Sequence, residues 1–172
     1  MKRPKLPPDP RFAAIQSISV LPIVDTRAGK KASVNMRKLQ GSVVSTLKKK
    51  RYSVRAAGTS GTAGQIDIED LESPDPLWVK KLGPADARWV MVICLDDVTS
   101  KITFGSTGNA EMSGFLFDKD SGGLIWKGRG VGQAGQGGLM GMTMKGMMKG
   151  EALQSAVFSL LSGVPKRPKP GK

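Results

Sequence analysis

The segment that most constrains the fold is Phe115–Arg129, which reads FLFDKDSGGLIWKGR. Two apolar runs flank Asp118–Gly123, where Asp and Ser side chains can hydrogen-bond the local backbone and Gly can adopt a positive φ, so the sequence predicts a β-hairpin. A long β-prone run, Trp89–Phe104, precedes this hairpin with no helical pattern between them. We therefore expect an antiparallel meander of three strands, at about 89–104, 109–117 and 124–132.

The first half of the chain predicts a strand–helix–strand unit. Ala14–Asp25 is typical of a strand, with Pro22 at its end or beside a bulge because Pro cannot donate to a ladder. A helix is expected from Ser33, as N-cap, to about Lys50, since apolar residues recur there every three or four positions. Tyr52–Ala56 is the next strand. A crossover of this length favours two parallel strands joined in a right-handed sense.

Two further helices complete the pattern. Asp75 and Pro76 begin a short helix that stops at Gly83, and a final helix is expected from about Glu151 to Ser162. The start of Trp89–Phe104 is apolar throughout, which indicates a central strand covered on both faces. The element order βαβαβββα predicts a single α/β (α+β) domain, with a mixed sheet and helices packed mainly on one face. A length of 172 residues suits one such domain.

The charge divides the chain into a domain and two basic ends. Residues 1–13 predict a basic, Pro-rich disordered segment, 14–165 the domain and 166–172 a basic tail. Of the 27 basic residues behind the net charge of +13, eight lie in these ends, against one acid, Asp9. The ends can serve as solubilising tails or can contact a membrane surface or another polyanion, and nucleic acid is the less favoured partner. The run Lys48–Arg51 has a structural explanation, because cations stabilise the end of a helix.

The residue types offer little for catalysis. The chain has no His, the commonest general base and metal ligand, and Cys94 lies in the most apolar strand, where a thiol is usually inert. The pairs Asp96–Asp97 and Asp118/Asp120 are typical of turns and backbone caps. The run Gly58–Gly64 lacks the Gly-Lys-Ser/Thr ending of a phosphate loop and predicts a surface loop. We therefore expect no enzyme, with no catalytic, cofactor or metal site.

A Gly- and Met-rich segment, at about residues 133–150, is the best candidate for a functional surface. Unbranched, polarizable Met side chains on a Gly-rich backbone can adapt to varied apolar surfaces, which favours contact with a partner or a membrane. The alternatives are a disordered loop and a helical lead-in to Glu151 whose Met residues join the core. The candidate partner-binding residues are Leu139, Met140, Met142, Met144, Met147 and Met148.

Five segments carry a resemblance to a known group of proteins. They read, in order, SISVLPIVD, RYSV, GPADARWVMVICLDDV, FLFDKDSGGLIWKG and ALQSAVFSLLSGVP. Their order resembles bacterial envelope proteins that include the curli-secretion lipoprotein, the lipoprotein activators of peptidoglycan synthases and related uncharacterised lipoproteins. The amino-terminal domain of the Tol-system translocation protein is more distantly similar. The shared features are apolar patterns, Asp-Gly turns and Trp, which describe a fold more than an activity.

The resemblance implies a periplasmic, non-enzymatic accessory protein that binds other envelope proteins and can form a homo-oligomer. It implies a role in outer-membrane secretion and assembly or in cell-wall synthesis. In the full-length form it also implies an outer-membrane anchor, a lipidated Cys that would precede the present sequence. The alternative from composition is a basic nucleic-acid-binding module, whose affinity would fall steeply with salt.

Overall fold

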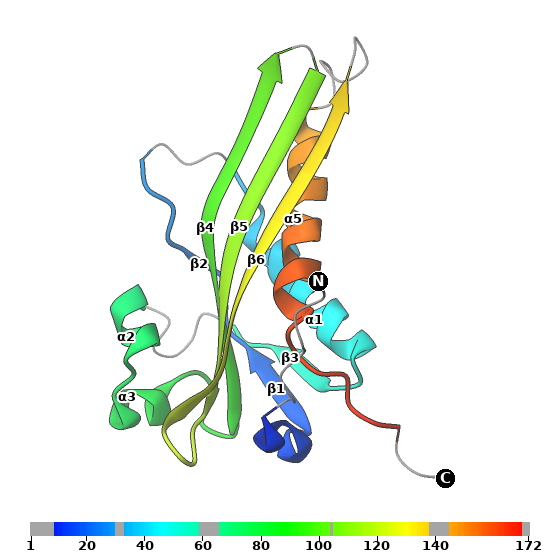
Figure 1. The fold of residues 1–172 in the computed structure, drawn as a ribbon. Coiled ribbons are helices and arrows are strands. Elements are labelled where there is room, and N and C mark those ends of the chain that lie inside the picture. The colour runs from blue at the N-terminus through cyan, green and yellow to red at the C-terminus, as the bar shows by residue number, and fades with distance from the viewer. Residues whose placement is uncertain (1–8, 30–32, 59–65, 104, 138–144, 170–172) are drawn as a thin grey trace, which may run out of the picture.

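Six strands form one mixed sheet in a computed structural model that describes residues 9–29, 33–58, 66–103, 105–137 and 145–169. The strand order is β3-β1-β4-β5-β6, with β2 also paired to β4 (Figure 1). This architecture confirms the predicted α/β class and mixed sheet. The elements are η1 Pro10–Ala14, β1 Ser17–Val20, β2 Val24–Asp25, α1 Met36–Lys49, β3 Ser53–Ala56, α2 Ile68–Glu72, α3 Pro76–Lys81, β4 Trp89–Thr103, β5 Gly105–Asp118, β6 Gly123–Gly137 and α5 Lys145–Leu161.

The parallel part of the sheet agrees with the predicted strand–helix–strand unit. β1 pairs with β3 and with β4 in parallel, and α1 forms the connection between β1 and β3. Pro22 lies in the gap between β1 and β2, as its missing N–H requires. The predicted cap was wrong. Asn35, not Ser33, caps α1, because its side-chain oxygen accepts a hydrogen bond from the Lys38 N–H at 2.9 Å.

The antiparallel meander is longer than its apolar pattern predicts. β4 pairs with β5 from Trp89–Asp118 to Thr103–Gly105, so β5 begins at Gly105 and not at Asn109. β6 runs to Gly137, five residues beyond the expected end. The hairpin turn is confirmed: the Asp118 carboxylate accepts the Asp120 N–H at 3.1 Å, and Gly122 has a φ of +69°.

The Gly residues of β6 have a packing role that the sequence did not reveal. Gly130 and Gly132 face α5, and a Cβ on either would overlap a backbone carbonyl oxygen of that helix, of Ala156 or Ala152 respectively. The helix backbone can therefore lie directly on the strand. α5 begins at Lys145, six residues before the expected Glu151. Both ends of the segment predicted as a loop over 133–150 thus belong to β6 and α5.

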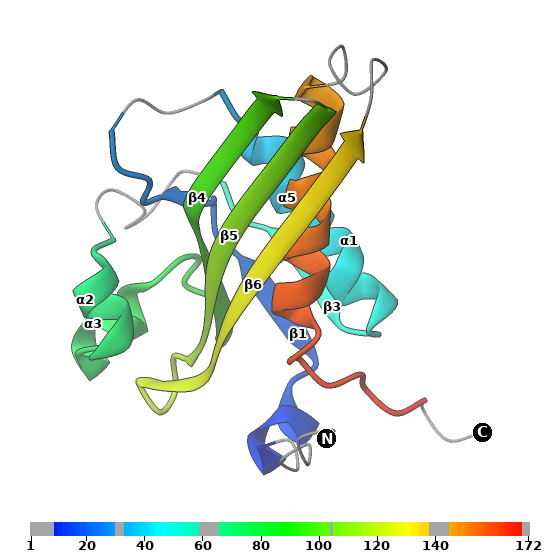
Figure 2. The same ribbon diagram turned by 45° about the horizontal axis from the view of Figure 1, so that its top comes forward.

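Two hydrophobic clusters cover opposite faces of the sheet (Figures 1 and 2). The larger lies under α1 and α5, and the smaller lies under α2 and α3. β4 serves both: Met91 and Ile93 join the larger cluster, whereas Val90 and Val92 join the smaller, and all four are fully buried. The expected central strand, covered on both faces, is confirmed. The short helix α2 was not predicted.

The chain ends lie against the domain where the structure describes them. Residues 10–14, most of which fall in the expected disordered segment 1–13, form η1, and Phe12 is buried in the larger cluster. In the tail, residues 166–169 form no helix or strand, yet the Arg167 N–H donates to the Lys50 carbonyl at 3.0 Å. The folded domain therefore extends slightly beyond both expected boundaries.

Candidate functional site

The six predicted partner-binding residues divide into three groups. Leu139, Met140, Met142 and Met144 lie outside the described residues. Met147 and Met148 both lie in the first turn of α5. Met147 is 46% exposed, whereas Met148 is buried. Since successive helix residues point about 100° apart, the helix directs one Met to the surface and the other inward. Contact with a partner stays a prediction for Met147.

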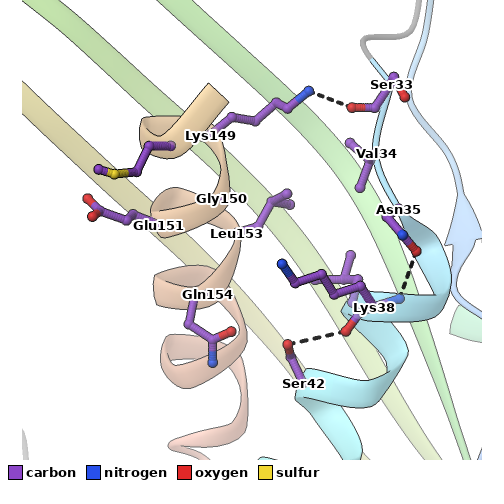
Figure 3. Close-up of a pocket in the computed structure, with 12 residues that line it drawn as sticks. Ser33, Val34, Asn35, Lys38, Ser42, Lys149, Gly150, Glu151, Leu153 and Gln154 are labelled. Carbon is purple, nitrogen blue, oxygen red and sulfur yellow. Dashed lines mark hydrogen bonds between the residues drawn. The ribbon is translucent and has the colours of Figure 1, made fainter. Parts of the chain in front are cut away.

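Met147 lines a groove between α1 and α5, with a volume of about 560 Å³ (Figure 3). Val34, Leu39 and Leu153 supply its apolar surface. Polar side chains from both helices surround them. The groove is lined by Ser33, Val34, Asn35, Lys38, Leu39, Ser42, Met147, Lys149, Gly150, Glu151, Leu153 and Gln154.

Several polar groups around the groove bond to the protein itself. Lys149 extends from α5 and its Nζ donates to the Ser33 carbonyl at 2.5 Å, which ties the two helices together at one end of the groove (Figure 3). On α1, the Ser42 hydroxyl donates to the Lys38 carbonyl at 3.3 Å. With donors used in this way, the groove offers apolar contact area between charged side chains, which suits a protein segment better than a reaction.

A stripe of α5 extends this surface along the helix. Met147, Glu151, Gln154 and Phe158 recur at intervals of four, three and four residues, which places them on one side of an α-helix. Phe158 is 47% exposed. Phe158 was not predicted as a site residue, although a signal was present: it lies in the helix expected from Glu151 to Ser162 but off the side formed by the other apolar residues of that helix.

The groups weighed for chemistry have structural roles. Cys94 is fully buried, and burial followed by the charge of Asp96 raises the pKa of its thiol to about 12, so the thiol stays protonated at neutral pH. The Asp96 carboxylate accepts hydrogen bonds from Thr26 Oγ1 at 2.8 Å and from Ser113 Oγ at 2.5 Å. It thereby ties β5 and the residue after β2 to β4.

Asp118 and Asp120 form ion pairs with Arg88, at 3.0 Å each. Burial alone would raise the pKa of Asp118. Hydrogen bonds from the Arg88 side chain and the Asp120 N–H outweigh burial and lower it. Asp118 thus acts as a charged clamp in the hairpin turn.

In the described part of the chain, no three His, Cys, Asp or Glu side chains are grouped to hold a metal ion. No described helix is long and apolar enough to cross a membrane.

No family model matches the chain, and no curated protein matches it. Solved structures do match. PelC from Paraburkholderia phytofirmans, solved as a dodecamer, aligns with a TM-score of 0.54 at 15% identity over 91% of each chain. The lipoprotein GNA1162 from Neisseria meningitidis aligns with a TM-score of 0.51 at 19% identity, over 77% of this chain and 94% of that one. This chain therefore shares its fold with PelC and GNA1162. The hypothetical protein CT253 from Chlamydia trachomatis is also similar, with a TM-score of 0.50 at 14% identity over 83% of this chain and 94% of that one.

These likenesses confirm the predicted resemblance at the level of the fold. The segments that carried it lie in β1, the start of β3, β4, the β5–β6 hairpin and α5.

Proposed function

We propose that the chain is a non-enzymatic accessory protein of the bacterial cell envelope that acts through protein–protein contacts. Its setting would be the periplasm, with an outer-membrane anchor in the full-length form. Its process would be secretion and assembly at the outer membrane, or cell-wall synthesis. A fold shared with a lipoprotein and with the subunit of a dodecamer supports the proposal.

The observation that carries the proposal is the pair of exposed apolar side chains, Met147 and Phe158, on the stripe of α5 beside the groove. Met147 and Phe158 are each about half exposed, and eleven residues of α-helix separate them by about 16 Å. Aromatic and Met side chains of this kind are enriched at protein interfaces, where a few anchors supply most of the binding energy. We name Met147, Phe158 and the groove between α5 and α1 the α5 face.

Self-association is the first form of contact to measure. We expect the wild-type protein to form an oligomer in size-exclusion chromatography with light scattering. Phe158→Glu and Met147→Glu should each weaken that association at least about tenfold, because a charge would replace an apolar anchor. Leu77→Glu is the matched control, since Leu77 is 68% exposed but lies on α3. Far-UV circular dichroism would verify that each variant folds.

Two results would contradict the α5 face as the interface. One is a wild-type protein that remains monomeric at every concentration and gives no cross-linked species. The other is loss of association in Leu77→Glu to the same degree as in Phe158→Glu.

A further inference from the structure

Two basic segments that lie far apart in the sequence meet at one end of the molecule. The first is Lys48–Arg51, where α1 ends, and the second is Lys166–Lys169, in the tail that follows α5. Figure 1 shows the tail leaving α5 close to the end of α1. We name the two segments together the basic pole.

Direct hydrogen bonds hold the two segments together. The Arg167 N–H donates to the Lys50 carbonyl at 3.0 Å, and the Arg51 guanidinium donates to the Arg167 carbonyl at 3.2 Å. Lys50 Nζ also reaches the Val164 carbonyl at 2.7 Å, and the Tyr52 hydroxyl donates to the Pro165 carbonyl at 2.8 Å. Backbone carbonyls accept all four bonds, so these contacts bring the two segments together without using a carboxylate.

The backbone conformation of Arg51 is a second unusual feature of the basic pole. Arg51 has a φ of +72°, in the left-handed region where Gly usually follows a helix. A non-Gly residue there is strained, and its guanidinium is one of the groups that hold the tail. Lys48, Lys49, Lys166 and Lys169 are exposed around this anchor.

Carboxylates contribute little at this end of the described chain. Asp9 lies beside the tail, across a cleft whose walls include Tyr52 and Arg167. It is paired with Arg11 at 2.6 Å, and this bond lowers the pKa of Asp9. None of the ion pairs within the described residues involves the four exposed lysines.

We infer that the basic pole docks on an anionic lipid surface. Clusters of four to eight Lys and Arg bind anionic membranes through headgroup phosphates, and each charge contributes about fivefold to the affinity. Lysine suits this partner, because it is a mobile point charge without the planar geometry used to read a base. Single-stranded nucleic acids are bound by stacking on aromatic rings, but Tyr52, the aromatic residue next to Arg51, is buried with its hydroxyl engaged. The inference does not depend on the α5 face.

The test is co-sedimentation of the whole chain with vesicles. One set contains phosphatidylcholine alone, and the other contains phosphatidylcholine with about one third phosphatidylglycerol. We expect binding to the anionic vesicles alone, with loss of binding as NaCl rises from about 0.1 M to about 0.5 M, because salt screens the interaction. The pole variant combines K48Q, K49Q, K166Q and K169Q, positions whose side chains make no hydrogen bond among those described here. It should bind at least about a hundredfold more weakly.

A control variant removes the same number of charges elsewhere, through R37Q, K80Q, K101Q and K127Q, all at exposed positions. It should lose clearly less affinity than the pole variant. Equal loss in both variants would mean that net charge alone drives binding, which overturns the inference. Equal binding to neutral vesicles would overturn it as well.

A short DNA duplex that displaces the protein from anionic vesicles at equal phosphate concentration would assign the pole to nucleic acid instead. The Phe158→Glu variant should bind vesicles as the wild type does, or with an affinity reduced only by the loss of avidity, so failure of one proposal is distinguishable from failure of the other.

Discussion

The two faces of the sheet are covered in different ways. On one face, α5 lies on β6 with the helix backbone against Gly130 and Gly132, so little side-chain volume separates them. On the other face, two short helices cover the sheet through aromatic packing. Phe117 meets Trp78 edge to face, with ring centroids 5.9 Å apart, and stacks near Phe115 at 6.5 Å.

The sheet is thus stabilised by two different kinds of packing. The α2–α3 face depends on the volume of large rings, which can shift slightly when a neighbour changes. On the α5 side, the contact with β6 at Gly130 and Gly132 depends on the absence of side chains on the strand, because the helix backbone there cannot move aside. The two faces should therefore respond to opposite substitutions, which the following variants test.

Phe117→Ala should have the largest effect. Phe117 is fully buried in the smaller cluster, and removing its ring leaves a cavity, so we expect a loss of about 4 kcal/mol in the free energy of unfolding. Urea unfolding, followed by both Trp fluorescence and far-UV circular dichroism, should show a single transition at lower urea. Two separated transitions would mean that the faces unfold independently, and the comparison of faces within one cooperative domain would fail.

Gly132→Val tests the opposite face by adding volume. The new side chain would overlap the Ala152 carbonyl, and we expect a loss of about 3 kcal/mol because the helix must move away from the strand. The measurement is the same urea titration. A variant as stable as the wild type would show that α5 does not lie on β6 as closely as described.

Asp118→Asn tests the hairpin end, where β5 meets β6. The pKa of Asp118 in the folded protein is lower than its ordinary value of 3.8, so its charge stabilises the fold above pH 3.8. That contribution is lost as pH falls below 3.8 through the folded pKa. We expect the variant to lose about 1 kcal/mol at neutral pH, and the difference from wild type to shrink in acid. A difference that stays constant between pH 7 and pH 3 would contradict the role of the charge.

Gly41→Ala should have the smallest effect, with the opposite sign from Gly132→Val. Gly41 is exposed in α1, and a Cβ there meets no atom within 4 Å. Ala stabilises an exposed helix position relative to Gly, so we expect a gain of about 0.5–1 kcal/mol in thermal or urea unfolding. A loss of stability would indicate a contact on α1 that the structure does not show.

Local chemistry in the sequence was enough to predict the framework of the fold. The turn residues Asp118–Gly123 fixed the hairpin, the apolar run after Trp89 identified the central strand, and Pro22 marked the end of β1. These features act over a few residues, so their physical meaning can be read without knowing what they touch.

The features that the sequence did not predict depend on distant partners. β6 passes through Gly130 and Gly132 although Gly weakens a strand, because α5 covers both residues and that helix follows later in the chain. The basic pole joins Arg51 to Arg167 across 116 residues. In the candidate site, Met147 was selected for its residue type, whereas Phe158 was overlooked although it lies inside the expected final helix and off its apolar side.

The backbone contact between α5 and β6 also has a mechanical consequence. Because β6 has no side chains at Gly130 and Gly132, α5 packs directly on the strand, and the two elements should move together as one rigid unit. α5 spans about 25 Å, from the groove at its first turn to the tail at its last. A displacement of α5 at the groove would therefore also displace the chain that follows Leu161, at the opposite end of the molecule.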